Sequence, residues 1–311
     1  MQGEESLFGK LNRLYPKLSK GQKRLADFVM KHYDKAAFMT AAELGREAEV
    51  SESTTVRFAS LLGYSGFPEF HETLEELVRN RLNSIQRMEV AYGQIPQSGI
   101  LHSVLSSDIE KIKLTMEHMD PEEFQKAVDI ILNARTVYVL GIRSCAPLAE
   151  FLSFYLHEIL KDVRLVSTNS PTETFEQMIR IEREDVLIGI SFPRYSMRTL
   201  KAVEFAHNRG AKVITLTDSM HAPINQSSSC KLIARSDMAS IVDSLTAPLS
   251  VINALVVALT MRKKDEVIRT MKLMEEIWNE YQVYSSEDEI AAAFDVKAME
   301  EDSEEKEKGK R

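Results

Sequence analysis

At 311 residues the chain has room for two domains of ordinary size, and its apolar and charged fractions, 44% and 28%, are those of a globular protein. Its two cysteines, Cys145 and Cys230, do not make a disulfide framework, so a reducing cytoplasm is expected. The net charge of −8 argues against general attraction to nucleic acid, and we expect neither a signal peptide nor a membrane span, since the most apolar stretch (245–261) is short and contains polar residues.

The first part of the chain is basic. A helix is expected over residues 18–32, with Ser19 as its N-cap and Leu25 and Val29 on its apolar face. Eight basic residues face two acidic ones between positions 8 and 35, which permits a local contact with DNA. The basic residues are Lys10, Arg13, Lys17, Lys20, Lys23, Arg24, Lys31 and Lys35.

Two short helices joined by a tight turn are expected next. Thr40 is placed to cap the first, which reaches about Ala48, and Ser51 to cap the second, which ends at Gly63. Such a pair is a helix-turn-helix (HTH) unit. The residues whose size and spacing suit its core are Ala41, Leu44, Ala48, Val50, Thr55, Val56 and Leu61.

The second helix of this unit is the candidate DNA reader, because the first turn of that helix enters the major groove. One turn further on stands Arg57, and arginine suits bidentate contact with guanine or phosphate. The alternative is a helical protein-docking module in which Arg57 is a solvated surface charge. The residues expected to contact DNA are Lys20, Lys23, Thr40, Ser51, Glu52, Ser53, Thr54 and Arg57.

Residues 7–80 resemble the N-terminal domain of the RpiR/MurR family of bacterial transcription regulators. The resemblance rests on LSKGQKRLADFVMKH at 18–32 and on VSESTTVRFASLLGYSGFPEF at 50–70. In that family an HTH domain precedes a sugar isomerase (SIS) domain that senses phosphorylated sugars. The resemblance implies a homodimer, or dimer of dimers, that binds a double-stranded DNA operator and a sugar phosphate effector, with Phe67 and Phe70 closing the small core.

The pattern later changes to alternating strands and helices. The expected strands are 136–140, 164–166, 186–190, 212–216 and 230–233, and the expected helices are 107–118, one starting at Asp120-Pro121, 148–160, 171–181, 197–208, 244–262 and 265–281. This alternation predicts an α/β three-layer domain with a five-stranded parallel sheet after the all-α N-terminal domain. The expected divisions are 1–81 (HTH), 82–106 (linker), 107–284 (SIS) and 285–311 (acidic, disordered tail).

Polar loops follow three of these strands, and parallel sheets bind ligands at the carboxyl ends of their strands. The loop after Gly141 runs directly into a helix whose N-terminus suits an anion, although its single glycine excludes a Walker A loop or a dinucleotide fingerprint. An ordinary βα turn is the alternative. The SIS resemblance matches Ser144 and Ser191 to sugar-phosphate serines and puts Ser196 at the phosphate-binding threonine. The candidate ligand residues are Gly141, Arg143, Ser144, Thr168, Asn169, Ser191, Arg194 and Ser196.

Pro193 and Arg194 replace the Ser-Gly that this SIS loop usually contains. Arg194 could supply charge to a phosphate, or it could form a salt bridge within a dimer. For Ser191 and Ser196, simple helix capping is the competing role.

A sugar-phosphate aldose–ketose isomerase with an accessory helical domain is the alternative function. Such an enzyme needs a general base and a ring-opening acid. Glu150 and Glu173 are candidate bases, and His157, His207 and His221 are candidate acids, but they form no motif. The cysteines and histidines also lack metal-ligand spacing, so no catalytic residue, metal or cofactor is expected.

Overall fold

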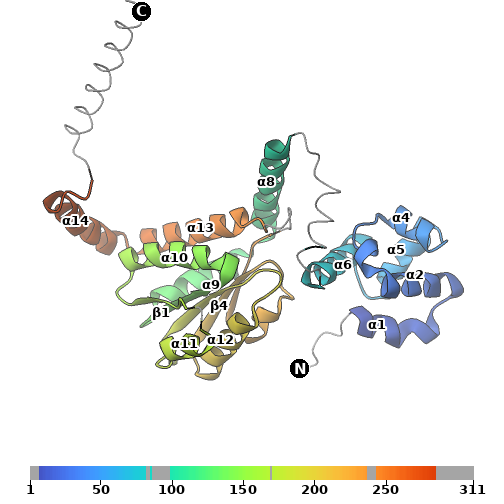
Figure 1. Cartoon of the computed structure of the whole chain (residues 1–311), viewed down its shortest axis with the longest axis horizontal. Helices are drawn as coiled ribbons and strands as arrows, with labels where there is room; N and C mark the ends of the chain where they lie inside the picture. Colours follow the sequence, from blue (N-terminus) through green and yellow to red (C-terminus); the bar gives the residue numbers. More distant parts are fainter. Residues whose placement is uncertain (1–6, 82–84, 86–98, 169, 237–242, 285–311) are drawn as a thin grey trace, which may run out of the picture.

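The computed structural model describes residues 7–81, 85, 99–168, 170–236 and 243–284 (Figure 1). The expected acidic tail and most of the expected linker lie outside the described residues. The described chain has an all-α N-terminal region (7–81) and an α/β region (99–284), which confirms the predicted fold class. Within these described ranges, no helix combines the length and the apolar character needed to cross a bilayer.

The N-terminal region is built around one apolar core. Leu25, Leu44, Phe58 and Phe70 are fully buried in it, and the Phe70 ring meets the Phe58 ring edge to face at 6.0 Å. Its helices are α1 (Leu7–Leu14), α2 (Lys20–Lys31), α3 (Tyr33–Ala36), α4 (Ala41–Glu47), α5 (Glu52–Leu61) and α6 (Phe67–Arg81), with a short 3-10 turn, η1 (Tyr15–Lys17). The expected helix-turn-helix corresponds to α4 and α5.

The prediction that Val56 and Leu61 belong to this core is wrong. Their side chains are 39% and 46% exposed, whereas Thr55, Phe58 and Leu62 are buried. Positions three and four apart share one face of a helix. The face that α5 turns inward therefore starts at Thr55, and an apolar residue one position out of phase points to solvent.

Five parallel strands form the sheet of the α/β region in the order β2-β1-β3-β4-β5. The strands are β1 (Val137–Gly141), β2 (Val163–Leu165), β3 (Val186–Ile190), β4 (Lys212–Thr217) and β5 (Cys230–Ile233). The helices are α8 (Ile100–His118), α9 (Pro121–Leu132), α10 (Ala146–Ile159), α11 (Pro171–Gln177), α12 (Met197–Asn208), α13 (Thr246–Arg262) and α14 (Lys264–Glu280), with 3-10 turns η2 (Arg143–Cys145) and η3 (Pro223–Ser227). Each strand lies within one residue of its predicted bounds.

Alternating side chains of the strands enter two separate cores. Val137 and Val139 of β1 pack with α9, α10 and α13, whereas Tyr138 and Leu140 pack on the opposite face with α12. Figure 1 shows α10 and α13 on one side of the sheet and α11 and α12 on the other. Because both faces are covered, β1 and β3 are buried and apolar throughout, whereas β2 and β5, at the two edges of the sheet, carry Arg164 and Lys231.

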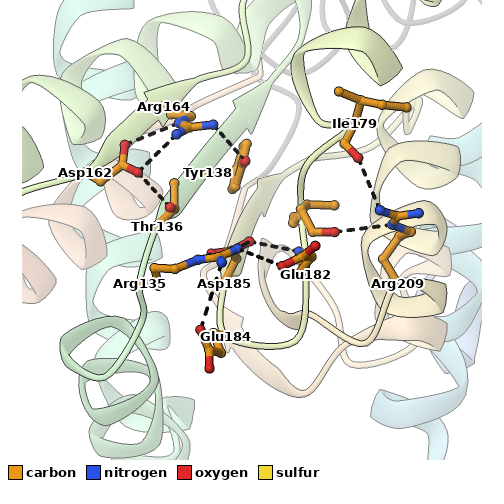
Figure 2. Close-up of polar contacts among 11 residues, drawn as sticks. Arg135, Thr136, Tyr138, Asp162, Arg164, Ile179, Glu182, Glu184, Asp185 and Arg209 are labelled. Carbon is orange, nitrogen blue, oxygen red and sulfur yellow. Dashed lines mark hydrogen bonds and ion pairs between the residues drawn. The ribbon is translucent and has the colours of Figure 1, made fainter.

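The amino ends of the strands are joined by ion pairs (Figure 2). Arg135 donates through Nε and Nη2 to both carboxylate oxygens of Asp185, at 2.9 and 2.8 Å. The Asp185 side chain is fully buried and also accepts the backbone N–H of Glu182 at 2.8 Å. These bonds fix the start of β3 beside β1, at the edge of the sheet opposite the strand-end loops.

Two helix boundaries differ from prediction by more than two residues. α8 begins at Ile100, within the expected linker, instead of near Ser107. The Ser106 hydroxyl lies 3.4 Å from His102 Nδ1, one turn earlier in the same helix. Residues 100–106, which were assigned to the linker, therefore form the first turns of α8.

The other difference is at the end of α11, which stops at Gln177 instead of Ile181. Arg209, just after α12, donates to the carbonyl oxygens of Ile179 and Ile181 at 3.2 and 3.3 Å (Figure 2). These carbonyls are thus satisfied by a side chain from a distant part of the chain, which the local sequence does not reveal.

Candidate functional site

The turn between α4 and α5 is held by contacts with its neighbours. The Val50 N–H donates to the Gly45 carbonyl at 2.7 Å, and Glu49 takes a left-handed φ of 52°. Arg24 of α2 donates to the Glu49 carbonyl at 2.5 Å and pairs with its carboxylate at 3.1 Å. A Cβ on Gly45 would lie 3.0 Å from Thr55 Oγ1, so glycine allows α4 and α5 to approach this closely.

Both expected N-caps are present at this unit. Thr40 and Glu43 form a capping box, with the Thr40 N–H donating to Glu43 at 2.8 Å. Ser51 accepts the Thr54 N–H at 3.3 Å at the start of α5. The two hydrogen bonds from Thr40 lower the pKa of Glu43. The bond from the Thr40 N–H contributes most, followed by the bond from the Thr40 hydroxyl. Because both helix starts are capped, the polar side chains of α5 stand on a fixed frame.

The side chains at the start of α5 face outward. Glu52, Ser53 and Arg57 are exposed, and Thr54 is half-buried. With Ser51 they form a continuous polar surface at the start of one helix. We refer to α5 as the reading helix.

The two α2 lysines have different surroundings. A Cβ on Gly21 would lie 3.2 Å from Val50, so the start of α2, where Lys20 is exposed, abuts the turn before the reading helix. Lys23 lies over the Tyr15 ring at 5.5 Å from its centre and is half-buried. Lys20 is therefore the more accessible of the two lysines beside the reading helix.

In the α/β region, a cavity of about 270 Å³ opens at the carboxyl ends of β1 and β2. Three loops surround this edge of the sheet: the first loop (142–145), the second loop (166–170) and the third loop (191–196), which follow β1, β2 and β3. The cavity is lined by Leu140, Gly141, Ile142, Arg143, Ala146, Val166, Ser167, Thr168, Thr174 and Arg198. Its two charged lining groups are both guanidinium groups, and the hydroxyls come from the second loop and α11.

Three of the eight predicted ligand residues line this cavity, namely Gly141, Arg143 and Thr168. Ser144 is exposed in the first loop next to them but is not part of the lining. Asn169 lies outside the described residues. The predicted ligand residues that line the cavity therefore come from the end of β1, the first loop and the second loop.

The third loop lies beside the cavity without lining it. Ser191 is buried, and its N–H donates to Leu216 of β4 at 3.1 Å. Arg194 is exposed, with a φ of 63°. Ser196 is the N-cap residue of α12, but its side chain makes no capping hydrogen bond. Helix capping, the competing role for Ser196, is therefore absent at this described position.

The first loop needs an unusual backbone. A Cβ on Gly141 would lie 2.4 Å from the Cys145 carbonyl oxygen, so only glycine lets the loop fold back on the end of β1. Arg143 has a φ of 59°, in the left-handed region that side chains other than glycine rarely adopt. Such conformations are held by the surrounding structure and concentrate at functional sites.

Sequence reasoning missed Arg198, which reaches the cavity from the first turn of α12. A cation in the first turn of a helix opposes the helix dipole, and this was the signal that could have identified it. An anion in the cavity would offset this repulsion, because it is attracted both by the guanidinium group and by the helix N-terminus. The next residue, Thr199, is 1% exposed, and its Oγ1 has no hydrogen-bond partner among the described residues.

The second loop is fixed by α11. Gln177 accepts the Ser167 N–H at 3.1 Å and donates to its carbonyl at 3.2 Å. Glu173, a candidate isomerase base, accepts a short hydrogen bond from the Thr168 hydroxyl. None of the candidate acids and bases Glu150, Glu173, His157, His207 and His221 is among the residues that line the cavity.

Both cysteine thiols are buried. Burial raises the pKa of the Cys145 thiol, and burial together with the Glu123 charge raises the pKa of Cys230 to about 12. Across the described ranges, no group of three or more His, Cys, Asp and Glu side chains is arranged to hold a metal ion.

Two family models match the chain. Residues 6–81 match the helix-turn-helix domain of the rpiR family, and residues 130–258 match the SIS domain. The first match contains α4, the turn and the reading helix, and the second contains all five strands and the cavity.

Two similar proteins with curated names are transcriptional regulators. An uncharacterized HTH-type transcriptional regulator of Clostridium perfringens is 27% identical over 221 residues, which cover 70% of this chain and 77% of that protein. The HTH-type transcriptional regulator HexR of Pseudomonas aeruginosa is 24% identical over 266 residues, which cover 83% of this chain and 90% of HexR.

Solved structures share the fold. The sugar isomerase domain of an RpiR transcription factor from Sphaerobacter thermophilus superposes with a TM-score of 0.55 at 24% identity, covering 58% of this chain and 99% of that one. The NanR protein of Vibrio vulnificus, complexed with ManNAc-6P, gives a TM-score of 0.54 at 19% identity and covers 88% of this chain and 99% of that one.

Proposed function

Because this chain belongs to the RpiR family of HTH-type transcriptional regulators and carries a SIS domain, we propose that a phosphorylated sugar bound in the SIS domain controls its affinity for operator DNA. In this proposal the HTH domain comprises residues 1–81 and the SIS domain residues 107–284, and the protein acts in the cytoplasm. The observation that carries the proposal is the pair of guanidinium groups, Arg143 and Arg198, in a cavity at the carboxyl edge of the sheet.

The chain is a regulator and not an isomerase. The relatives named above are transcriptional regulators, and an HTH domain is present. None of the candidate acids and bases lines the cavity, although Glu173 accepts a hydrogen bond from the lining residue Thr168.

The effector that we propose is a sugar phosphate. Two arginines can hold a phosphate through forked, charge-assisted hydrogen bonds, and the hydroxyls of Ser167, Thr168 and Thr174 can meet those of a sugar. The structurally similar NanR is complexed with a phosphorylated amino sugar, which supports this ligand class. Ser144, Ser191, Arg194 and Ser196 would join the site if the first and third loops closed on the ligand.

For DNA, we propose that Ser51, Glu52, Ser53, Thr54 and Arg57 of the reading helix read base edges, while Lys20 contacts phosphate. Arg57 is exposed one turn into α5, where it can reach guanine in the major groove. Thr40 and Lys23 would contact the backbone from α4 and α2. A palindromic operator would place two such helices about one turn of DNA apart.

We further propose that the protein is a homodimer joined by its SIS domains. Apolar side chains are exposed on three helices of the α/β region: Leu101, Leu105, Ile109 and Met116 on α8, Val257 and Met261 on α13, and Leu273 and Ile277 on α14. Apolar side chains exposed together on neighbouring helices are a feature of protein interfaces. A second copy would cover it and would supply the second reading helix.

Regulation requires that the effector bind two conformations of this dimer unequally. Closure of the loops on the phosphate would shift the strand ends and change the separation of the two reading helices. Since that separation must match the DNA repeat, a small change is enough to alter operator affinity.

The experiment uses the full chain. Operator sequences are selected from genomic DNA, and their affinity is then measured with and without a panel of sugar phosphates that includes ManNAc-6P. We expect one of them to change operator affinity in the parent and to lose its effect in Arg198→Ala and in the Ser144→Ala, Ser196→Ala double variant.

Arg180→Ala is the matched control, because Arg180 is an exposed arginine just beyond α11 that does not line the cavity. It should retain the response to the effector. An unchanged effector response in both site variants would show that the sensor lies elsewhere in the protein.

A further inference from the structure

We infer that the N-terminal region docks on the carboxyl edge of its own sheet through an ion pair between Glu72 of α6 and Arg235, which follows β5. The contact is intramolecular and involves neither the reading helix nor the cavity. It goes beyond the proposed function because it identifies the surface through which one part of the chain holds the other.

The ion pair joins two well-anchored residues. The Glu72 carboxylate meets Arg235 Nη1, with 43% and 25% of their side chains exposed. Glu72 stands on α6 between Phe70 and Leu74, both fully buried in the N-terminal core. The Arg235 N–H donates to Thr115 Oγ1 of α8 at 2.8 Å. Each partner is therefore anchored to a packed helix: Glu72 is part of α6, and Arg235 is hydrogen-bonded to α8.

A second observation places the same two surfaces together. The pKa of Glu69 is lowered, first by the hydrogen bond from the Ser65 N–H and with the smallest contributions from the charges of Lys10 and His221. His221 lies in the turn after β4, and Glu69 precedes Glu72 by about one turn of α6. The acidic side of α6 thus faces two side chains of the α/β region: Arg235 lies opposite Glu72, and His221 lies opposite Glu69.

The docked arrangement leaves the reading helix open. Figure 1 shows α6 between the rest of the N-terminal helices and the sheet, with α4 and α5 on the side away from it. The contact therefore does not block DNA. It fixes the direction in which the reading helix points.

The docking surface is also connected to the third loop. The Ala234 N–H donates to the Thr217 carbonyl at 2.8 Å, just before Arg235. The Thr217 and Tyr195 hydroxyls both donate to the Asp218 carboxylate, at 3.2 and 2.9 Å. Tyr195 belongs to the third loop, so loop closure and docking act on the same strand ends. This regulatory role rests on the proposed effector site, whereas the docking itself does not.

Partly exposed ion pairs are weak, which suits a contact that must be released and reformed. The test is hydrogen exchange of the full chain without DNA or ligand, in Glu72→Arg, in Arg235→Glu and in the charge-swapped double variant. Each single variant should speed amide exchange in residues 64–72 and 219–221 by about two- to five-fold. The double variant restores an ion pair and should return exchange close to the parent rate.

Arg183→Glu is the control for the change in net charge, because Arg183 is exposed at the opposite edge of the sheet. It should leave exchange in both segments unchanged. Melting temperatures of all four variants check that the fold is retained. If the single variants have no effect, or if their effects add in the double variant without recovery, the docking contact does not exist. Because neither DNA nor sugar phosphate is used, this outcome is independent of the proposed function.

Discussion

The two regions of this protein hold their functional side chains in different ways. In the N-terminal region, Ser53 and Arg57 project from regular turns of a capped helix, above a core closed by Phe58 and Phe70. In the α/β region, Arg143 lies in a loop with a φ of 59°, and Arg198 enters the cavity from a different helix. One surface comes from a single helix, while the other is assembled from four separated segments.

This difference determines where each surface is vulnerable. The reading surface fails if the small core beneath α5 fails, because the helix geometry itself is regular. The cavity depends on the backbone path of its loops, so it can be lost while the sheet remains folded. Loss of function should therefore accompany loss of stability after a core substitution in the N-terminal region, whereas a loop substitution in the α/β region can remove ligand binding from a protein that remains folded.

The largest effect is expected in the N-terminal core. Phe70→Ala removes a fully buried ring that packs on Phe58 and Tyr64, and should cost about 3–5 kcal/mol of stability. Chemical unfolding of the full chain should show early loss of the N-terminal region. Phe38→Ala is the control, because Phe38 is 40% exposed. Equal losses in both variants would mean that this core does not support the reading helix.

A smaller cost with a specific functional loss is expected at the first loop. Gly141→Ala places a Cβ against the Cys145 carbonyl and should cost about 1–3 kcal/mol, since the loop must move. Thermal-shift titration should show that a sugar phosphate which stabilises the parent no longer does so. Gly66→Ala, whose new Cβ meets only Pro68 at 3.5 Å, should keep that ligand response. Full ligand stabilisation in Gly141→Ala would refute the assigned cavity.

On the reading helix, we expect a loss of function without a loss of stability. Arg57→Ala should weaken operator binding by about ten- to hundredfold, because one base-edge or phosphate contact is removed. Fluorescence anisotropy at constant salt measures the change. Arg183→Ala removes the same charge from the α/β region, and should bind operator as tightly as the parent. A matching loss there would indicate that only net charge matters.

The cap of the reading helix contributes less. Ser51→Ala leaves the Thr54 N–H without its side-chain acceptor and should cost about 1 kcal/mol. Urea unfolding measures this cost, and Ser60→Ala on the exposed side of α5 is the control. A cost of zero would mean that the turn, and not the cap, determines where α5 begins.

The smallest effect concerns pH. The pKa of Glu43 is below its ordinary value of 4.5 because the Thr40 N–H and hydroxyl donate to its carboxylate. A carboxylate whose pKa is lowered by folding stabilises the protein above the unfolded-state pKa, and this contribution is lost as pH falls through the folded-state value. The melting temperature of the parent should therefore fall more than that of Glu43→Gln below pH 4.5. Parallel curves would contradict this.

Local signals were enough for most of the fold. Ser19, Thr40, Ser51 and Asp120 each cap a helix where expected, because capping involves residues only two or three positions apart. The strands could also be located, most clearly β1 and β3, since a strand buried on both faces must be apolar throughout. The reading helix could also be found from local sequence, because its exposed residues follow one another along one element.

Only the tertiary structure decided which side chains meet. Val56 and Leu61 have the composition of core residues, yet the packing of α5 turns them outward. Arg24 holds the turn before α5, and Arg198 enters the cavity from a helix that follows a different strand. Sequence spacing encodes neighbours along one element, whereas contacts between elements depend on how each helix is rotated and where each strand ends. Those quantities are fixed only when the whole core packs.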